Sequence, residues 1–358
     1  MTAREHLEKP CRALKLLILG GTVFLGRHLV ASALRCGHQV TLFNRGQSNP
    51  SLYGSQAQSS GSEVEQICGD RQLDLDILKG RHFDAVIDTC GYNGADVEKS
   101  SRALENCVAR YIFISSISAY KTAGLPPGAC LSEASPVVAQ PVPPEESNYA
   151  TQKALCEAAV LRTLGERALI LRPGLIVGPY DPTDRFTYWL RRIRRGGLVL
   201  APGAPTRQVQ FIDARDLSDF IIKLAGTGES GIFNGVGPDK PLTMQELLLG
   251  IKNRLAHTSA SLSHTADLIW LADQDMLKMS VSPWMEMPLW LPEADETAAM
   301  LRVSTEKALA AGLRISPLHR TIDDTNSFDL SRGLEYETKA GLSSEKEMSI
   351  LASFNARG

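Results

Sequence analysis

The chain has 358 residues, of which 43% are hydrophobic and 22% charged, and a formal net charge of -2; this is the composition of an ordinary globular protein of about two domains. The slight acidity argues against general nucleic-acid binding, which usually requires a basic face. No apolar run approaches the roughly 20 residues that span a membrane, and residues 1–12 lack a signal-peptide core, so we expect a cytoplasmic protein with a flexible tail over residues 1–13.

The first predicted unit is a strand, a glycine turn and a helix. The apolar run Leu16–Leu19 stops at Gly20, and apolar residues then recur at helical spacing from Phe24. Such a turn leaves free N–H groups at the positive end of a helix dipole, where a pyrophosphate usually binds. In the spacing G-x-x-G-x-x-G, Gly26 matches but Val23 replaces the middle glycine, so a merely structural turn is the alternative.

Short apolar strands then alternate with helices up to about residue 171. This alternation predicts an α/β fold with a doubly wound parallel sheet, the Rossmann architecture, and ligands at the carboxyl ends of its strands. Residues 121–147 are proline-rich and typical of a functional lid or a mobile segment. The predicted strands are 37–43, 65–68, 84–88, 111–115 and 168–171, and the helices are 73–78, 97–108 and 148–164.

The pattern is less regular after residue 180. Residues 14–180, with about 208–237, are expected to form the dinucleotide-binding domain; residues 181–207 and 238–358 form a smaller substrate-binding cap with a C-terminal helix. Thr243 and Glu246 predict a capping box. Further predictions are a basic helix at 186–195, a strand at 209–212, helices at 217–224, 242–255 and 343–354, and an aromatic loop at 284–292.

Cysteine and histidine patterns give no sign of a metal site. None of the seven cysteines forms a C-x-x-C pair, and the seven histidines are dispersed. Most cysteines stand in apolar runs, so we expect small buried thiols.

Tyr149 and Lys153 lie four residues apart on a predicted helix and therefore share a face. A lysine ammonium beside a phenol favours the phenolate and lowers its pKa from about 10, so that the pair can move a proton to or from an alcohol or ketone oxygen. Taken alone, the pair also fits a surface tyrosine stacked on a lysine stem. Ser115 and Ser116 end the strand before this helix, and a hydroxyl there can bind the same substrate oxygen.

In this order, the segments LILGGTVFLGRHL, CGD, FISSISAY, YATQK, LRPGLIVGPYDP and FIDARDL resemble the extended, atypical short-chain dehydrogenase/reductase superfamily, of the NAD-dependent epimerase/dehydratase type. The resemblance covers residues 14–224. It implies that Tyr149 is the general acid/base, that Lys153 binds the nicotinamide ribose, and that Ser116 is the catalytic serine. It implies a cofactor site made of Gly20, Gly21, Thr22, Phe24, Leu25, Gly26, Asn44, Arg45, Asp70, Arg71, Thr89, Cys90, Gly91, Ser115, Tyr149, Lys153 and Pro173.

Some residues depart from the resemblance. Ile117 and Ser118 replace the Asp-Glu pair of the family's dehydratases, which argues against dehydration of a sugar nucleotide. The arginine of nucleotide-sugar epimerases is Val209 here, and Arg207, on the same face of the predicted strand, is a substitute. These departures leave a nucleotide-sugar substrate in doubt.

The second strand ends in Asn44-Arg45 without an acid; between the two forms of NAD(P), this favours NADP(H), because an arginine accommodates the 2′-phosphate. We therefore expect an NAD(P)-dependent oxidoreductase or epimerase acting on a small molecule, and a homodimer. The alternative is an RNA-associated or regulatory protein on the same fold without turnover. Its RNA contact would be the arginine cluster of Arg191, Arg192, Arg194 and Arg195, although a solvated helix face is the favoured reading of that cluster.

Overall fold

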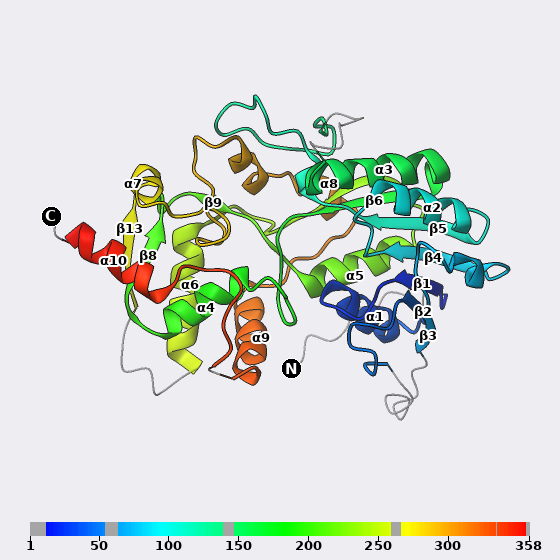
Figure 1. Cartoon of the computed structure of the whole chain (residues 1–358), viewed down its shortest axis with the longest axis horizontal. Helices are drawn as coiled ribbons and strands as arrows, with labels where there is room; N and C mark the ends of the chain where they lie inside the picture. Colours follow the sequence, from blue (N-terminus) through cyan, green and yellow to red (C-terminus); the bar gives the residue numbers. More distant parts are fainter. Residues whose placement is uncertain (1–11, 54–63, 139–146, 259–265, 334, 356–358) are drawn as a thin grey trace.

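The structure is a computed structural model that describes residues 12–53, 64–138, 147–258, 266–333 and 335–355. Figure 1 shows two lobes side by side, one built on a sheet and the other holding most of the chain after residue 180. Seven parallel strands form the sheet in the order β11-β6-β5-β4-β1-β2-β3, which confirms the predicted doubly wound fold. The strands are β1 Lys15–Leu19, β2 Gln39–Asn44, β3 Val64–Cys68, β4 Phe83–Asp88, β5 Val108–Ile114, β6 Ala168–Pro173 and β11 Gly231–Gly235.

Helices cover both faces of this sheet because side chains alternate along a strand. In β1, Leu16 and Ile18 pack with α1 and α5, whereas Leu17 and Leu19 pack in a second cluster with α2 and α3. All four leucine and isoleucine side chains are at most 1% exposed, so β1 is the hydrophobic centre of the sheet lobe. Its helices are α1 Leu25–Arg35, α2 Gly94–Leu104, α3 Tyr149–Leu164 and α5 Ala214–Ala225.

The second lobe, the cap, has its own hydrophobic core around Trp189 and Trp290. The predicted capping box at its helix α6 is confirmed: the hydroxyl of Thr243 accepts the N–H of Glu246, whose carboxylate accepts from Thr243. The cap helices are α4 Arg185–Arg194, α6 Met244–Thr258, α7 Asp273–Lys278, α9 Leu318–Ser331 and α10 Ser344–Asn355, and its paired strands are β8 Gly197–Pro202 with β13 Ala266–Leu271 and β9 Gln208–Val209 with β12 Leu242–Thr243.

Two predicted elements and one domain assignment need correction. The helix expected at 73–78 is the short 3₁₀ turn Leu75–Leu78. The strand expected at 209–212 is split into β9 and β10 (Ile212–Asp213), which pairs with β7 (Ile176–Val177), so Arg207 does not share a strand face with Val209. Residues 306–310, which the predicted domain division assigns to the cap, form helix α8 (Glu306–Ala310), and this helix packs against β11 of the sheet. The rest of the domain division stays a proposal.

The described part of the proline-rich stretch is anchored to the molecule. Leu131 is 1% exposed and pairs with Val303. Residues 139–146 of the expected lid, and residues 1–11 of the expected tail, lie outside the described residues. Within the described ranges, no helix combines the length and apolarity needed to cross a membrane.

Candidate functional site

A cavity of about 700 Å³, here called the main cavity, opens at the carboxyl ends of strands β1, β2, β4 and β5. This is the place and size expected for a cofactor site in a parallel sheet. Gly91 does not line it, although its carbonyl accepts a hydrogen bond from Lys153. The other predicted site residues all line it: Gly20, Gly21, Thr22, Phe24, Leu25, Gly26, Asn44, Arg45, Asp70, Arg71, Thr89, Cys90, Ser115, Ser116, Tyr149, Lys153 and Pro173.

The glycine turn is shaped for a close approach of an anion to its backbone. Gly20 and Gly21 have φ values of +106° and +96°, which other residues rarely adopt. A Cβ on Gly26 would lie 2.7 Å from the Cα of Gly21, so the helix packs on the turn only without a side chain. Val23, at the place of the missing glycine, is 46% exposed. Helix α1 has no acid and no side-chain cap at its start, so its N–H groups and dipole fit a pyrophosphate.

The ends of β2 and β3 differ in how freely their side chains can meet a ligand. The amide of Asn44 donates to the carbonyl of Gly20 over 2.9 Å and accepts the N–H of Gly46, so this residue holds the turn in place. Asp70 accepts the N–H of Gln72 over 2.7 Å. Arg45 is exposed and, among the described residues, forms neither a hydrogen bond nor an ion pair. Its guanidinium therefore remains for a ligand.

Helix α3 begins at Tyr149, and a capping box between Asn148 and Thr151 fixes this start. Tyr149 is 52% exposed, whereas Lys153, one turn later, is only 3% exposed. The ammonium of Lys153 donates to the carbonyls of Gly91 and Ile114 over 2.9 and 2.8 Å and lies 5.8 Å from the centre of the Tyr149 ring. The pair thus faces the main cavity, but the ammonium is held by backbone oxygens.

This arrangement corrects the predicted effect of the lysine on the phenol. Although half of the Tyr149 side chain is exposed, partial burial of the phenol raises its pKa above 10, and the nearby hydroxyl of Ser116 opposes only part of that rise. Burial also lowers the pKa of Lys153, while the charge of Asp88 opposes the change. The expected lowering of the phenol pKa is therefore wrong for this arrangement, because the ammonium is engaged by two carbonyls instead of the phenol oxygen.

Among the lining residues missed from the sequence are Tyr92, Asn93 and Asp96. These three residues follow the end of β4, and ligands of a parallel sheet bind at the carboxyl ends of its strands. Their position after a strand end could therefore have identified them as site residues. The ammonium of Lys153 lies 4.8 Å from the centre of the Tyr92 ring. The side chain of Asn93 accepts the N–H of Ala95 and so caps α2.

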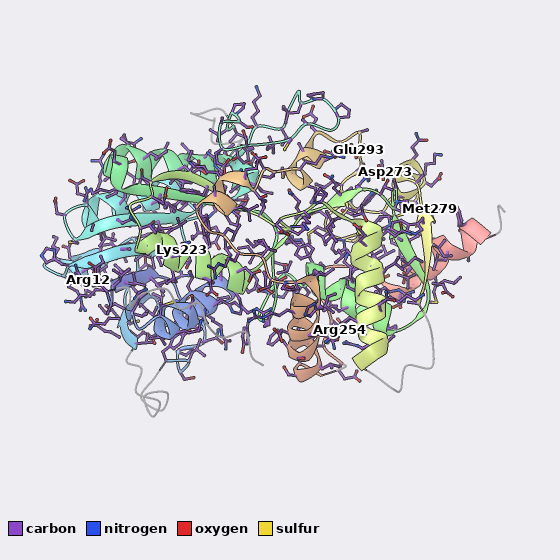
Figure 2. All side chains as sticks on the ribbon, turned by 180° about the vertical axis from the view of Figure 1, so that it is seen from behind. Arg12, Lys223, Arg254, Asp273, Met279 and Glu293 are labelled. Atoms are coloured by element: carbon purple, nitrogen blue, oxygen red, sulfur yellow. The ribbon has the colours of Figure 1, made fainter. Side chains whose placement is uncertain are left out.

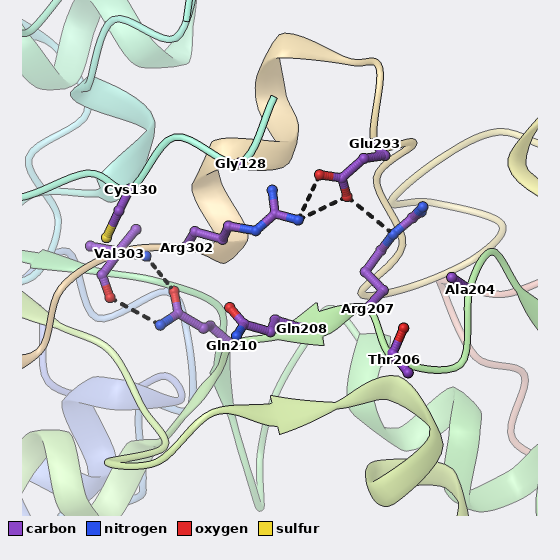
Figure 3. Close-up of a pocket in the computed structure, with 10 residues that line it drawn as sticks. All are labelled: Gly128, Cys130, Ala204, Thr206, Arg207, Gln208, Gln210, Glu293, Arg302 and Val303. Atoms are coloured by element: carbon purple, nitrogen blue, oxygen red, sulfur yellow. Dashed lines mark hydrogen bonds and ion pairs between the residues drawn. The ribbon is translucent and has the colours of Figure 1, made fainter. Parts of the chain in front are cut away.

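A second cavity, of about 730 Å³, lies on the cap side and includes Arg207, Glu293 and Arg302 (Figure 3). Arg302 donates to both oxygens of Glu293 over 2.7 and 2.8 Å. Arg207 donates to both oxygens of Asp273 over 2.7 and 2.6 Å, and Figure 2 shows this aspartate and Glu293 close together on the cap. Both guanidinium groups already have carboxylate partners, and Val209 is buried, so Arg207 does not offer the free cation expected of a phosphate ligand.

The arginine cluster of α4 is not a solvated face. Arg191 and Arg194 pair with Asp329 of α9, which is 0% exposed, at 2.8 Å each. Arg192 pairs with Glu347 of α10 over 2.5 Å, and both are nearly buried. The favoured sequence interpretation is therefore wrong, because the acids that bury these arginines come from more than 130 residues later in the chain.

The cysteines also differ from the prediction. Among the six that the structure describes, only Cys156 is buried, and Cys36, Cys68 and Cys130 are exposed. Cys36 caps the end of α1, and Cys68 is the last residue of β3. Both thiols lie where a helix or strand ends at the surface, so they are exposed although they belong to apolar runs. In the described part of the chain, no three His, Cys, Asp or Glu side chains are grouped to hold a metal ion.

Comparison with known sequences points to one family. The sequence profile described as "NAD dependent epimerase/dehydratase family" matches residues 16–235. The chloroplast stem-loop binding protein of 41 kDa b from Arabidopsis thaliana is 28% identical over 246 residues. That match covers 65% of this chain and 61% of the plant protein, so the chain spans less than two thirds of its relative.

Solved structures share the fold. A UDP-N-acetylglucosamine 4-epimerase from Methanobrevibacter ruminantium M1, in complex with UDP-N-acetylmuramic acid, has a TM-score of 0.64 at 19% identity and covers 89% of this chain and 99% of its own. The Bordetella bronchiseptica enzyme WbmG, in complex with NAD and UDP, has a TM-score of 0.62 at 16% identity and covers 90% and 96%. At such identities the likeness concerns the fold.

Proposed function

Because the chain belongs to the NAD dependent epimerase/dehydratase family, we propose that it is an NAD(P)-dependent oxidoreductase of the epimerase or reductase type, acting at a carbinol or carbonyl carbon of a small molecule. The observation that carries the proposal is that Tyr149, Ser116 and Lys153 line the same cavity as the glycine turn. When bound, the nicotinamide gives or takes a hydride. The glycine turn and the start of α1 would hold the pyrophosphate, and Lys153 would hold the nicotinamide ribose.

The chain's own residues move the proton. A phenol has an ordinary pKa of about 10, and that of Tyr149 is raised further, so it is protonated at neutral pH and can donate to a carbonyl oxygen. Ser116, which lines the same cavity, would hold that oxygen by a hydrogen bond. Net reduction would need this proton transfer once, whereas epimerisation requires the transient ketone to be presented again on its other face.

The test of this mechanism is the substitution Tyr149→Phe, which removes only the proton donor. We would first find a substrate by following NAD(P)H consumption with a panel of aldehydes, ketones and UDP sugars. The variant should then lose about 10²- to 10⁴-fold in kcat while binding NADPH as the wild type does, measured by nucleotide fluorescence. Unchanged turnover with the cofactor bound would remove the mechanism.

The identity of the cofactor and of the substrate are finer parts of the proposal. The free guanidinium of Arg45 supports NADP(H), because it can pair with a 2′-phosphate. By their descriptions, one solved neighbour contains NAD and UDP and another contains UDP-N-acetylmuramic acid. In this chain Arg207 is held by Asp273, which favours a substrate without a diphosphate. The homodimer and the cytoplasmic location stay parts of the proposal; light scattering and cell fractionation test them.

RNA binding is the second candidate function, and the name of the Arabidopsis relative favours it. Three of the four arginines expected at the contact are paired with acids inside the cap, so α4 is a poor contact surface. If the protein binds RNA, its affinity for a stem-loop should fall steeply with salt. Absence of binding at moderate salt would discard this candidate.

A further inference from the structure

A buried ion pair joins helix α3 to strand β6 and takes no part in the mechanism above. Glu157, two turns after Tyr149 on α3, is 3% exposed, and Arg172 of β6 is 2% exposed. Arg172 donates to both oxygens of Glu157, from Nε over 2.8 Å and from Nη2 over 2.5 Å. Neither residue lines the main cavity, so the pair can act on a reaction there only through its neighbours.

The ion pair holds the chain on both sides of Ser116. On one side, the hydroxyl of Ser115 donates to Oε1 of Glu157 over 2.5 Å. On the other side, the guanidinium of Arg172 lies 4.5 Å from the centre of the Tyr120 ring. The short 3₁₀ turn that follows Ser116 is therefore fixed at its start and at its end.

These contacts give the two neighbouring serines different tasks, although both line the main cavity. A hydroxyl has one hydrogen to donate. The hydrogen of Ser115 goes to Glu157, so it is not available to the oxygen of a ligand. The N–H of Ser118 donates to the hydroxyl of Ser116 over 3.1 Å and uses only an acceptor position there, so Ser116 can still donate its hydrogen to a substrate oxygen.

Glu157 also ties this turn to the helix that carries Tyr149. Lys153, one turn before Glu157, donates to the carbonyl of Ile114 over 2.8 Å. Helix α3 is thus bonded to the last residue of β5 and, through Glu157, to the residue after it. Because Tyr149 begins the same helix, these bonds set where its phenol lies relative to the hydroxyl of Ser116. A misplacement of about 1 Å between reacting groups can cost about 100-fold in rate.

We propose that Glu157 is a positioning residue for the reaction, which, with Arg172, sets the place of the Ser116 hydroxyl relative to the Tyr149 phenol. This inference rests on the proposed function. Because Glu157 does not line the main cavity, its loss should lower kcat without weakening the cofactor. The loss should matter only while Ser116 has its hydroxyl.

The experiment is a double-mutant cycle on the full chain, with the carbonyl substrate found in the screen described above. Glu157→Gln keeps the shape of the side chain but removes the charge that holds Arg172. It should lower kcat about 10- to 100-fold and leave the affinity for NADPH within about 2-fold of the wild type. Ser116→Ala alone should lower kcat about 100-fold or more, the effect of losing a donor to the reacting oxygen.

The two substitutions are then combined. In the Ser116→Ala background, Glu157→Gln should change kcat by less than about 2-fold, because no hydroxyl is left to position. A merely structural role of Glu157 would instead lower kcat by the same factor in both backgrounds.

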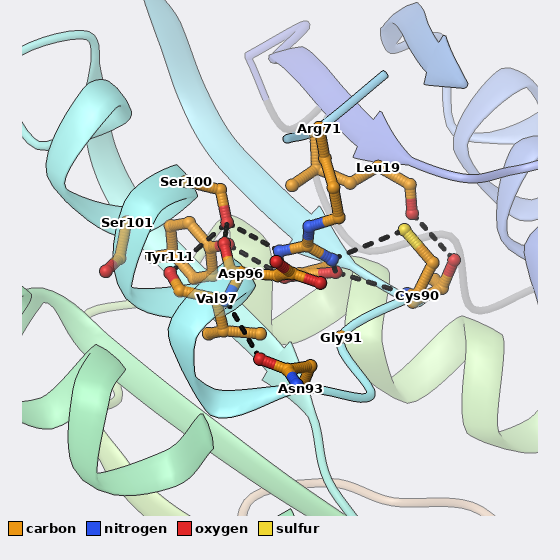
Figure 4. A network of polar contacts seen from close by, with 12 residues as sticks. Leu19, Arg71, Cys90, Gly91, Asn93, Asp96, Val97, Ser100, Ser101 and Tyr111 are labelled. Atoms are coloured by element: carbon orange, nitrogen blue, oxygen red, sulfur yellow. Dashed lines mark hydrogen bonds and ion pairs between the residues drawn. The ribbon is translucent and has the colours of Figure 1, made fainter. Parts of the chain in front are cut away.

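Asp88→Asn is the matched control. Asp88, the last residue of β4, is a second fully buried acid with an arginine partner. Arg71 donates to both of its oxygens over 3.1 and 2.8 Å, and the hydroxyl of Tyr111 donates to it over 2.9 Å; Figure 4 shows both donors. Any effect of Asp88→Asn on kcat should be the same, within about 2-fold, with and without the hydroxyl of Ser116.

If Glu157→Gln does not fold, Ser115→Ala decides, because it removes the bond to Glu157 and leaves the ion pair intact. It should lower kcat about 10-fold, the value of a hydrogen bond to a charged group, and show the same dependence on Ser116. Wild-type kcat in either folded variant, or equal factors in both backgrounds, would overturn this inference alone. A wild-type protein that binds neither NADPH nor NADH would overturn the proposed function, and this inference with it.

Discussion

Gly26→Ala tests whether the tight contact at the glycine turn supports folding. The added Cβ would lie 2.7 Å from the Cα of Gly21 and 2.9 Å from its C and N atoms. None of these is a side-chain atom that can rotate away, so the cost should reach the upper part of the roughly 1–3 kcal/mol typical of overpacking. Alanine gains at most about 1 kcal/mol in helix propensity. We expect a net loss of about 2 kcal/mol in the free energy of unfolding.

Gly250→Ala in α6 is the matched control. Its Cβ would meet only the Cδ2 atom of Leu318, at 3.2 Å, and that flexible end can shift. The propensity gain should then dominate, so this variant should be unchanged or up to about 1 kcal/mol more stable. Urea unfolding followed by far-ultraviolet circular dichroism gives the free energy of unfolding, because both lobes contain helices. A loss below about 0.5 kcal/mol for Gly26→Ala, or an equal loss in both variants, would refute the reasoning.

Three further predictions concern cofactor choice and the cap. Arg45→Ala should weaken NADPH about 10- to 100-fold, the value of a hydrogen bond to a charged group, and leave NADH unchanged in fluorescence titrations; equal effects on both would contradict the 2′-phosphate contact. Glu347→Gln leaves the buried Arg192 without its partner and should cost about 3–5 kcal/mol in urea unfolding followed by tryptophan fluorescence, whereas Glu345→Gln, exposed on the same helix, should cost little. Burial raises the pKa of Asp329, but its three arginine partners outweigh burial, so the pKa is lowered. The contribution of Asp329 to the free energy of unfolding is therefore present above about pH 4, the pKa in the unfolded chain, and is lost as the pH falls through the folded pKa. The stability difference between wild type and Asp329→Asn should shrink in acid, and a constant difference from pH 7 to pH 2 would contradict this assignment.

Local patterns predicted the sheet lobe well. The run Leu16–Leu19 and the glycine turn after it are patterns of residues adjacent in the sequence, and they predict a strand followed by a helix. The i, i+4 spacing of Tyr149 and Lys153 is equally local and places both side chains on one face of a helix. Strand order then follows from the doubly wound rule, which brings the end of β1 and the end of β5 to one edge of the sheet. This is why residues separated by more than a hundred positions could be assigned to one cavity.

Long-range partners could not be predicted in the same way. Nothing near Arg192 indicates that Glu347 will bury it, and nothing near Arg71 indicates Asp88 as its partner. Likewise, the hydrogen bonds of Lys153 to two carbonyls are a property of the folded backbone. Residue type and spacing indicate which groups can ionise, but the pKa depends on burial and on neighbours that only the fold supplies.

The pairing of α4 with the last helices has a consequence for the order in which the chain matures on the ribosome. Strands β1 to β6 are complete by residue 173, so most of the sheet can assemble while the nascent chain is still growing. Arg191 and Arg192, by contrast, meet their acids only after Asp329 and Glu347 have been synthesised. A chain released before residue 329 would thus carry a nearly complete sheet beside a cap whose Arg191 and Arg192 both lack their acids.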